Sequence, residues 1–248
     1  MNQASLHRLL MANAKKKDPK VLFDQRLATN LTLIQQLYFS LYPEETNLDN
    51  FQKLLSLLPV LFKERPEHLK LQDISRIEEG NWYQSEKIVG LQLYVEHFNK
   101  DLKGLREKIP YFKELGVNFL HLMPITTRPK GESDGGYAVN DYLKVDPKYG
   151  TKEDLLELTT EFRKQGIYLM LDFVVNHTSN EFSWAKKAIR GDKKYQGYYY
   201  TFEDYTIPAE FEKTLPEVFP ETSPGSFTYI PEMGRWVMTV FNSYQWDL

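Results

Sequence analysis

The alternation of strand-like and helix-like segments from residue 88 to residue 172 limits the fold of this chain more than any other feature. Three apolar segments of this region have the composition of strands: Ile88–Val95, Val117–Met123 and Ile167–Asp172. The segments between them have the periodicity of helices, over Gly104–Leu115 and from Thr151 to Gly166. Successive parallel strands are joined by crossover helices, so the pattern predicts an α/β fold with a parallel sheet.

The ends of these helices carry their own signals. Gly116 and Gly166 directly follow the two helical segments, and glycine is the residue most often found where a helix stops. Thr151 followed by Asp154 is the pattern of a helix start, in which the two side chains cap the backbone of the first turn. The connections between the predicted strands are therefore helices of ordinary length.

The third predicted strand ends abruptly in polar residues. Its apolar part has the sparse polarity of a strand buried on both faces, and Asn176 and His177 follow soon after. Barrels of the α/β class build active sites at the carboxyl ends of such strands. His177 can donate to or accept from a hydroxyl without adding a fixed charge, which suits a sugar. Asp172 and Asn176 either belong to the same site or only satisfy backbone groups of the loop.

A second polar segment follows the second predicted strand. It contains Asp134, Gly135, Gly136 and Tyr137. The glycines permit positive φ angles and a close approach of a ligand to the backbone. Asp134 offers two acceptor oxygens for paired hydroxyls, and Tyr137 offers a flat apolar face for a pyranose ring. An Asp-Gly-Gly turn alone is weak evidence, but its pairing with the polar end of the third strand predicts a sugar site.

These two segments, Asp134–Tyr142 and Asp172–Ser179, resemble the motifs of glycoside hydrolase family 13, the α-amylase family. Further segments support the resemblance: Asp101–Leu105, Lys108–Gly116, Leu120–Pro124 and Phe241–Leu248. Within the family the chain looks most similar to the amylosucrases and sucrose hydrolases. The resemblance implies the N-terminal part, about three strands, of a (β/α)8 TIM barrel. It divides the chain into a helical N-terminal domain (1–87), the first βα units of the catalytic barrel (88–178) and a B-domain-like insertion (179–248).

The N-terminal segment shows helical periodicity and no group of catalytic side chains. Apolar residues recur at helical spacing at Leu33, Ile34, Leu37, Tyr38 and Leu41. Thr46 with Asp49 predicts a helix start, and Pro59 and Pro66 are expected to interrupt the helices that follow. We interpret this segment as packing structure.

The resemblance also implies the chemistry of a parent enzyme, a retaining glucosyl transferase or hydrolase that acts on sucrose and α-1,4-glucan. Family members carry the nucleophile and the acid/base at the fourth and fifth barrel strands, and the chain is expected to end before the fourth. Arg190-Gly191-Asp192 has the right spacing for the nucleophile motif but is interpreted as a surface turn. We therefore expect no catalytic residue and no activity of the chain alone. The expected substrate-binding residues are Asp134, Tyr137, His177, Phe241 and Gln245, with Asp172 and Asn176 in structural roles.

Several alternatives remain open from the sequence. The parent could be an α-glucosidase, a sucrose phosphorylase or a trehalose synthase, and the chain could be a carbohydrate-binding fragment without catalysis. A carboxylate pair of Asp134 and Asp172 is a further, less favoured route to hydrolysis. No metal or other cofactor is expected.

Bulk properties exclude other classes of function. A net charge of −3 argues against nucleic acid, and the Lys15–Lys17 cluster with Lys20 is interpreted as a solvated face. The chain has no cysteine, and it contains no apolar run of the ~20 residues that a membrane span needs. We expect a cytoplasmic protein, and the sequence leaves its oligomeric state open.

Overall fold

The computed structural model describes residues 18–248, which divide into two compact units at Lys87 and Ile88. The first unit is helical, with α2 (Pro19–Leu41), α3 (Glu44–Glu64), α4 (Glu67–Glu79) and the short 3-10 helix η1 (Trp82–Gln84). Asp18 caps α2, since its Oδ1 accepts a hydrogen bond from the backbone N–H of Lys20 at 2.9 Å. The Lys15–Lys17 cluster and the helical prediction for residues 1–17 lie outside the described residues.

Two boundary predictions for this unit are wrong. α3 begins at Glu44, directly after Pro43, so Thr46 and Asp49 lie inside the helix instead of starting it. Pro59 also lies inside α3 and does not interrupt it, whereas Pro66 precedes α4. The ring of Phe62, one turn beyond Pro59, stacks on Phe23 of α2 with centroids 4.4 Å apart. Pro59 has no N–H to donate, so α3 lacks one backbone hydrogen bond there. The packing of Phe62 against α2 helps the helix to continue past this position.

The helical unit buries few side chains. Its described core contains Leu22 and Ile74, with Ile77 packed against them. The predicted apolar repeat on α2 lies largely at the surface, because Leu33, Leu37 and Leu41 are 53%, 58% and 74% exposed.

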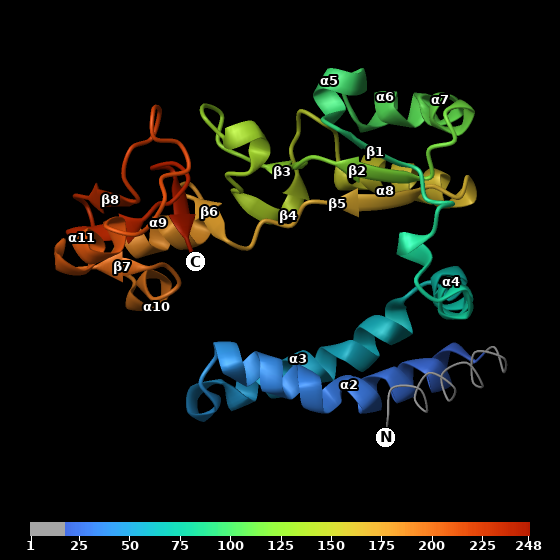
Figure 1. Cartoon of the computed structure of the whole chain (residues 1–248), viewed down its shortest axis with the longest axis horizontal. Helices are drawn as coiled ribbons and strands as arrows, with labels where there is room; N and C mark the ends of the chain where they lie inside the picture. The colour runs from blue at the N-terminus through green and yellow to red at the C-terminus, as the bar shows by residue number, and fades with distance from the viewer. Residues whose placement is uncertain (1–17) are drawn as a thin grey trace. The chain divides into compact units, whose positions relative to one another are not determined.

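The second unit contains a parallel sheet with the strand order β1 (Gly90–Leu93), β2 (Phe119–Leu122), β5 (Tyr168–Leu171). Each strand lies within one of the three segments predicted from the sequence, and Figure 1 shows the three arrows side by side. Helices connect the strands, as the alternation predicts. The prediction of an α/β fold with part of a (β/α)8 barrel is confirmed, and the sheet is not a closed barrel.

Helices cover one face of this sheet. Leu91, Leu120 and Leu169 lie in one register row and pack in the core with residues of the helices. The covering helices are α6 (Leu102–Glu107), α7 (Ile109–Glu114) and α8 (Lys152–Lys164), and α5 (Val95–Asn99) follows β1. Side chains alternate along a strand, so the row Gln92, His121, Met170 points to the opposite face. That face therefore carries the polar groups.

Two details differ from the sequence prediction. The segment Gly104–Leu115 is not one helix, because a break at Lys108 separates α6 from α7. Pro110, the second residue of α7, donates no hydrogen bond and would clash with the carbonyl four residues earlier in a continuous helix. β5 is not buried on both faces either: it is an edge strand of the described sheet, and Met170 and Leu171 are 41% and 40% exposed.

The signals at the ends of α8 are confirmed. The Thr151 and Asp154 side chains form a complete capping box, and Gly166 adopts a φ of 72°. Leu158 and Phe162 of this helix are fully buried against the sheet.

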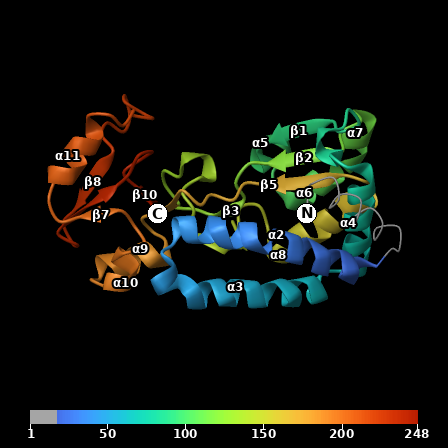
Figure 2. The ribbon, with the colours of Figure 1, turned by 60° about the horizontal axis from the view of Figure 1, so that its bottom comes forward.

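The rest of the unit consists of short elements that the sequence did not reveal. Their bounds are β3 (Thr126–Thr127), η2 (Asp134–Gly136), β4 (Asp141–Val145), β6 (His177–Ser179), α9 (Ser183–Ile189), α10 (Lys193–Gln196), β7 (Thr201–Phe202), α11 (Thr206–Glu212), β8 (Phe227–Ile230), β9 (Arg235–Met238) and β10 (Gln245–Asp247). The antiparallel sheet β7-β9-β8 and helices α9–α11 lie at the opposite end of the unit from the parallel sheet (Figure 2).

A second core holds this region together. Its buried members include Phe182, Tyr199, Val237 and Trp246, and the rings of Tyr199 and Trp246 meet edge to face at 5.4 Å. Part of the aromatic side chains of this region therefore serves packing, whereas others, such as Tyr200 and Tyr229, are exposed. Among the described helices of both units, none is long and apolar enough to cross a membrane.

Candidate sugar-binding site

The turn at Asp134 is strained and tightly enclosed. Asp134, Gly135 and Gly136 have φ angles of 48°, 62° and 102°. A Cβ atom at Gly135 would lie 2.8 Å from the Tyr94 hydroxyl, and one at Gly136 would lie 3.2 Å from the Pro124 carbonyl oxygen. Glycine is therefore required at both positions, as the sequence predicts. Asp134 is one of two described residues other than glycine with positive φ, a strain that concentrates at functional sites.

An ion cluster supports this turn from behind. A Cβ at Gly136 would also lie 3.3 Å from Nη1 of Arg128, whose Nη2 is 3.1 Å from Glu96 Oε2. Burial tends to raise the pKa of Glu96, but hydrogen bonds from Lys148, Tyr149 and Arg128 lower it to about 2. Glu96 therefore stays ionised at any ordinary pH, and Arg128 stays fixed against the turn.

Gln245 links Asp134 to His177. Its Nε2 donates to Asp134 Oδ2 at 3.1 Å and lies 3.0 Å from His177 Nε2. An amide nitrogen only donates, so His177 Nε2 is the acceptor and carries no hydrogen. Burial lowers the pKa of His177, which favours this neutral ring. Asn242 fixes the amide by donating to Gln245 Oε1 at 2.7 Å.

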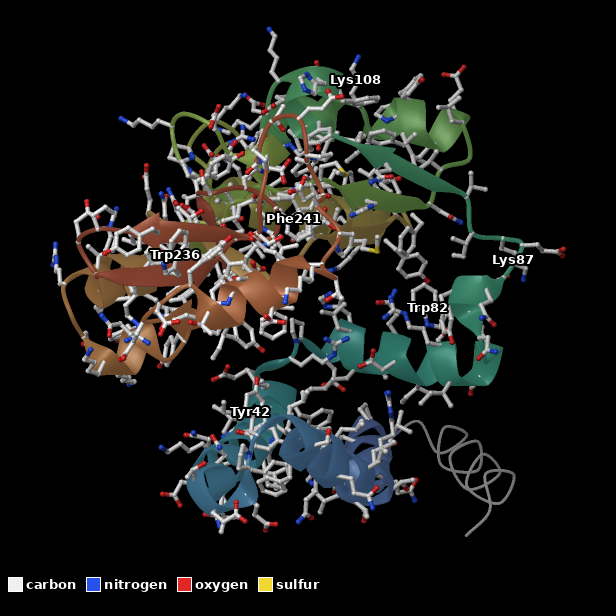
Figure 3. All side chains as sticks on the ribbon, turned by 60° about the vertical axis from the view of Figure 1, so that its left-hand side comes forward. Tyr42, Trp82, Lys87, Lys108, Trp236 and Phe241 are labelled. Atoms are coloured by element: carbon white, nitrogen blue, oxygen red, sulfur yellow. The ribbon has the colours of Figure 1, made fainter. Side chains whose placement is uncertain are left out.

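Pairing of β6 with β10 brings these residues together. The two strands are antiparallel, with Gln245 opposite Ser179 and Asp247 opposite His177. Phe241, labelled in Figure 3, belongs to the loop before β10. Its ring centroid lies 5.0 Å from that of His177. A segment near the end of the chain thus completes the polar end of the third barrel strand.

Asp247 anchors the same loop. Its Oδ1 accepts from Asn176 Nδ2 at 2.7 Å, and its Oδ2 accepts from the Val240 backbone N–H at 2.8 Å. Burial raises the pKa of Asp247 to about 6, although both hydrogen bonds act in the opposite direction. Asn176 therefore holds the loop before β10 through Asp247.

A second group of side chains converges on Asp172. The Tyr137 hydroxyl donates to Asp172 Oδ2 at 3.0 Å, and His121 Nε2 lies 2.9 Å from Asp172 Oδ1. Burial, together with Asp172, raises the pKa of Tyr137 to about 12, so its hydroxyl remains a donor. Both oxygens of Asp172 are occupied, and the ring of Tyr137 is held in one orientation.

A cavity of about 330 Å³ opens beside Asp134. It is lined by Glu132, Ser133, Asp134, Phe219, Thr222, Asn242 and Tyr244. The lining combines aromatic rings with hydroxyl, amide and carboxylate groups, which is the chemistry that recognises a polyol. Among residues 18–248 no cluster of three or more His, Asp or Glu side chains is arranged to hold a metal ion.

The structure brings most of the predicted site residues together. Asp134, His177 and Gln245 form one hydrogen-bonded chain, Phe241 contacts His177, and Tyr137 belongs to the neighbouring group around Asp172. The Arg190-Gly191-Asp192 segment is an exposed turn in which Asp192 caps α10.

Sequence reasoning missed three residues of the site, Tyr94, His121 and Asp247. His121 had a recognisable signal, since it is a polar residue between the buried Leu120 and Leu122 of a strand. Tyr94 and Asp247 had none, because their roles depend on contacts with residues that lie far away in the sequence.

Comparison with known proteins gives one consistent answer. The family model described as alpha amylase, catalytic domain, matches residues 70–248. Trehalose-6-phosphate hydrolase of Bacillus subtilis (strain 168) is 36% identical over 148 residues, which is 55% of this chain and 26% of that protein.

Solved structures agree with this match. A mutant of the protein MutB in complex with the substrate sucrose aligns with a TM-score of 0.57 and 30% identity, over 65% of this chain and 29% of that one. An isomaltulose synthase mutant from Erwinia rhapontici NX5 in complex with its natural substrate sucrose aligns with a TM-score of 0.57 and 27% identity, with the same coverage of both chains. The chain spans less than a third of the length of these relatives. By its fold, its motifs and the match over residues 70–248, the chain belongs to the α-amylase family.

Proposed function

We propose that residues 88–248 bind the glucosyl unit of sucrose or of an α-1,4-glucan, as part of an amylosucrase-like retaining enzyme. The observation that carries this proposal is the hydrogen-bonded chain Asp134–Gln245–His177, whose first member, Asp134, lines a cavity of about 330 Å³. The solved structures of two similar proteins in complex with sucrose support the choice of substrate.

Each side chain has a separate role in this proposal. Asp134 accepts from sugar hydroxyls, and the neutral imidazole of His177 exchanges hydrogen bonds with another. Tyr137 stacks beneath the pyranose ring, in an orientation fixed by its bond to Asp172 at 3.0 Å. Phe241 closes the apolar side next to His177, and Gln245 holds Asp134 and His177 in place. These contacts strengthen as the ring flattens in the transition state.

The sequence ending Phe241–Leu248 and the helical first unit favour an amylosucrase over other family members. The charge of the cavity supports this choice. Its lining includes Glu132 and Asp134 but neither lysine nor arginine. A phosphorylated sugar, such as the substrate named for the trehalose-6-phosphate hydrolases, would meet like charge there and no cation to bind its phosphate. The site therefore suits an uncharged sugar.

Catalysis needs more than these residues. Hydrolysis with retention requires a free carboxylate nucleophile and a separate acid, whereas Asp172 is held by Tyr137 and His121, and Asp134 by Gln245. We propose that the described residues bind sugar without turning it over. We further propose a cytoplasmic location and no cofactor.

Calorimetric titration of the full 248-residue chain with sucrose tests the proposal. We expect saturable binding that His177→Ala weakens at least about tenfold, since a buried hydrogen-bonding group is lost. His68→Ala is the matched control, because His68 is exposed and lies in the helical unit. Absence of sucrose binding, or equal loss in both variants, would show that the site assignment is wrong. Release of glucose or fructose above a blank without protein would refute the claim that the chain alone is inactive.

A further inference from the structure

We propose a second carbohydrate site on the antiparallel sheet β7-β9-β8, where Tyr205, Tyr229 and Trp236 form an exposed aromatic surface that binds an α-glucan chain. This surface is distinct from the cavity at Asp134, since none of its three residues lines that cavity. The choice of ligand rests on the proposed function, because an enzyme that acts on a glucan gains from holding the polymer near its site.

The three rings form one continuous surface. Tyr229 of β8 lies directly opposite Trp236 of β9, with ring centroids 5.3 Å apart, and Tyr205 lies 4.3 Å from Trp236 on the other side. Tyr205 and Tyr229 are 38% and 46% exposed, and Trp236, labelled in Figure 3, is partly exposed between them. Trp236 precedes the fully buried Val237, so the rings lie on the sheet face opposite the second core.

Only one end of this face is covered. Phe227 shares the face with Tyr229 and is buried, and Phe211 of α11 lies 6.4 Å from it. At the other end Tyr205 and Tyr229 remain 38% and 46% exposed, although both contact Trp236. Packing therefore accounts for Phe227, and the faces of the other rings remain open to solvent in part.

The chemistry around the rings selects the ligand. Arg235 is paired with Glu203 at 3.0 Å, and Glu212 accepts from the Tyr205 hydroxyl. Glu232 follows β8 in the sequence and adds a further negative charge. A polyanion such as nucleic acid needs unpaired cations, which these residues do not supply. Three rings are also far smaller than the roughly 800 Å² per partner of a stable protein interface. A neutral polyol with apolar C–H faces fits both constraints.

The relative tilt of the rings favours one shape of polyol. Trp236 is tilted by 47° to Tyr205 and by 52° to Tyr229, so the three rings do not form one flat platform. An α-1,4-glucan curves, and successive glucose rings turn their faces at an angle to one another, whereas a β-1,4-glucan is a flat ribbon. Rings that are not coplanar therefore suit an α-glucan better than a flat ribbon.

Native electrophoresis of the full chain in gels that contain amylose tests the proposal. We expect amylose to retard the wild-type chain, and Trp236→Ala and Tyr229→Ala to raise the apparent Kd at least about fivefold, because each removes a stacking face. Tyr83→Ala is the matched control, since Tyr83 is 58% exposed in the helical unit, and it should be retarded like the wild type. Tyr229→Ala removes a half-exposed ring, so it reports binding even if Trp236→Ala impairs folding.

The proposal would be overturned if amylose did not retard the wild type, or if neither Trp236→Ala nor Tyr229→Ala weakened the retardation. It would also be overturned if Tyr83→Ala weakened the retardation as much as these two variants. Stronger retardation by gels with cellulose oligosaccharides than with amylose would overturn the ligand class. His177→Ala separates this site from the cavity: it should weaken sucrose binding, and the further rise in apparent Kd for amylose caused by Trp236→Ala should be as large in the His177→Ala background as in the wild type. If the wild-type chain binds no sucrose but is still retarded by amylose in a way that depends on Trp236, the proposed function is wrong and the second site stands.

Discussion

The two cores of the second unit are built from different chemistry. The core beneath the parallel sheet consists of aliphatic and aromatic side chains, with Leu120, Leu122 and Phe162 at its centre. Around β6 and β10 the buried residues include hydrogen-bonding groups. Within residues 18–248, the buried polar side chains all lie in this second region: His177, Thr178, Ser179, Gln196, Ser226, Thr239, Gln245 and Asp247.

This difference suggests separate roles for the two regions, one in stabilising the fold and one in the proposed binding of a ligand. An apolar core is stabilised by area and volume, so any side chain of suitable size maintains it. A polar core is stable only when each donor meets its acceptor, so it fixes particular atoms in particular places. The apolar core beneath the sheet therefore tolerates exchange of its side chains, whereas the region around β6 and β10, the site of the proposed recognition, adds a hydrogen-bond network to its packing.

The largest effect should come from the apolar core. Leu120→Ala removes a fully buried side chain from the middle strand of the parallel sheet, and it should lower the free energy of unfolding by about 3–5 kcal/mol. Urea denaturation of the full chain, followed by circular dichroism, measures the loss. Leu143→Ala is the control, because that side chain is 85% exposed and should change stability by less than about 0.5 kcal/mol. Similar losses in both variants would contradict the assignment of this core.

The polar core should instead respond to pH through Asp247. Its pKa of about 6 in the folded chain lies above its ordinary value of 3.8, so the folded chain keeps a proton that the unfolded chain releases. Stability from this residue is therefore complete below about pH 4 and is lost as the pH rises through 6. The loss should reach up to about 3 kcal/mol at neutral pH.

Asp247→Asn reveals this contribution, because the amide does not ionise. The variant adds an unfavourable contact with the Asn176 amide, but that cost does not depend on pH. We expect the difference in unfolding free energy between variant and wild type to move in favour of the variant from pH 4 to pH 7. A difference that stays constant over this range would show that Asp247 has an ordinary pKa.

The same contrast explains what the sequence could predict. The sheet and its helices follow from local patterns, namely apolar runs, the Thr151 cap and the glycines at helix ends. The break before Pro110 was missed because the apolar periodicity continues across it, although the missing N–H decides the outcome.

Of the site, the sequence could indicate the residues but not their partners. Gln245 and Asp134 are separated by 111 positions, and no local pattern connects them. The short strands β6 and β10 lack any alternation long enough to be recognised, since each has only three residues. Their pairing depends on tertiary context, which also determines that Asp247 anchors Asn176.

A direct test of the polar core is Gln245→Ala. It leaves Asp134 and His177 without the amide that joins them, and it should lower the unfolding free energy by about 2 kcal/mol. Sucrose binding should weaken more than this loss of stability explains, because the two groups are no longer held in place. Gln84→Ala, at an exposed position in the helical unit, should change neither quantity. Retention of full sucrose affinity by Gln245→Ala would show that the network is only structural.

The smallest expected effect comes from a variant that should change stability without changing sucrose binding. Thr151→Ala removes the hydroxyl that accepts from the Asp154 backbone N–H at 3.2 Å, and it should destabilise α8 by about 1 kcal/mol. α8 contributes Leu158 and Phe162 to the apolar core and no residue to the hydrogen-bonded chain at His177. Unfolding by urea should therefore shift while sucrose affinity, measured well below the transition, stays unchanged. Thr151→Ser keeps the hydroxyl and should restore the stability. A parallel fall in sucrose affinity in Thr151→Ala would mean that the two cores act as one unit, and that the separation between support and recognition does not hold.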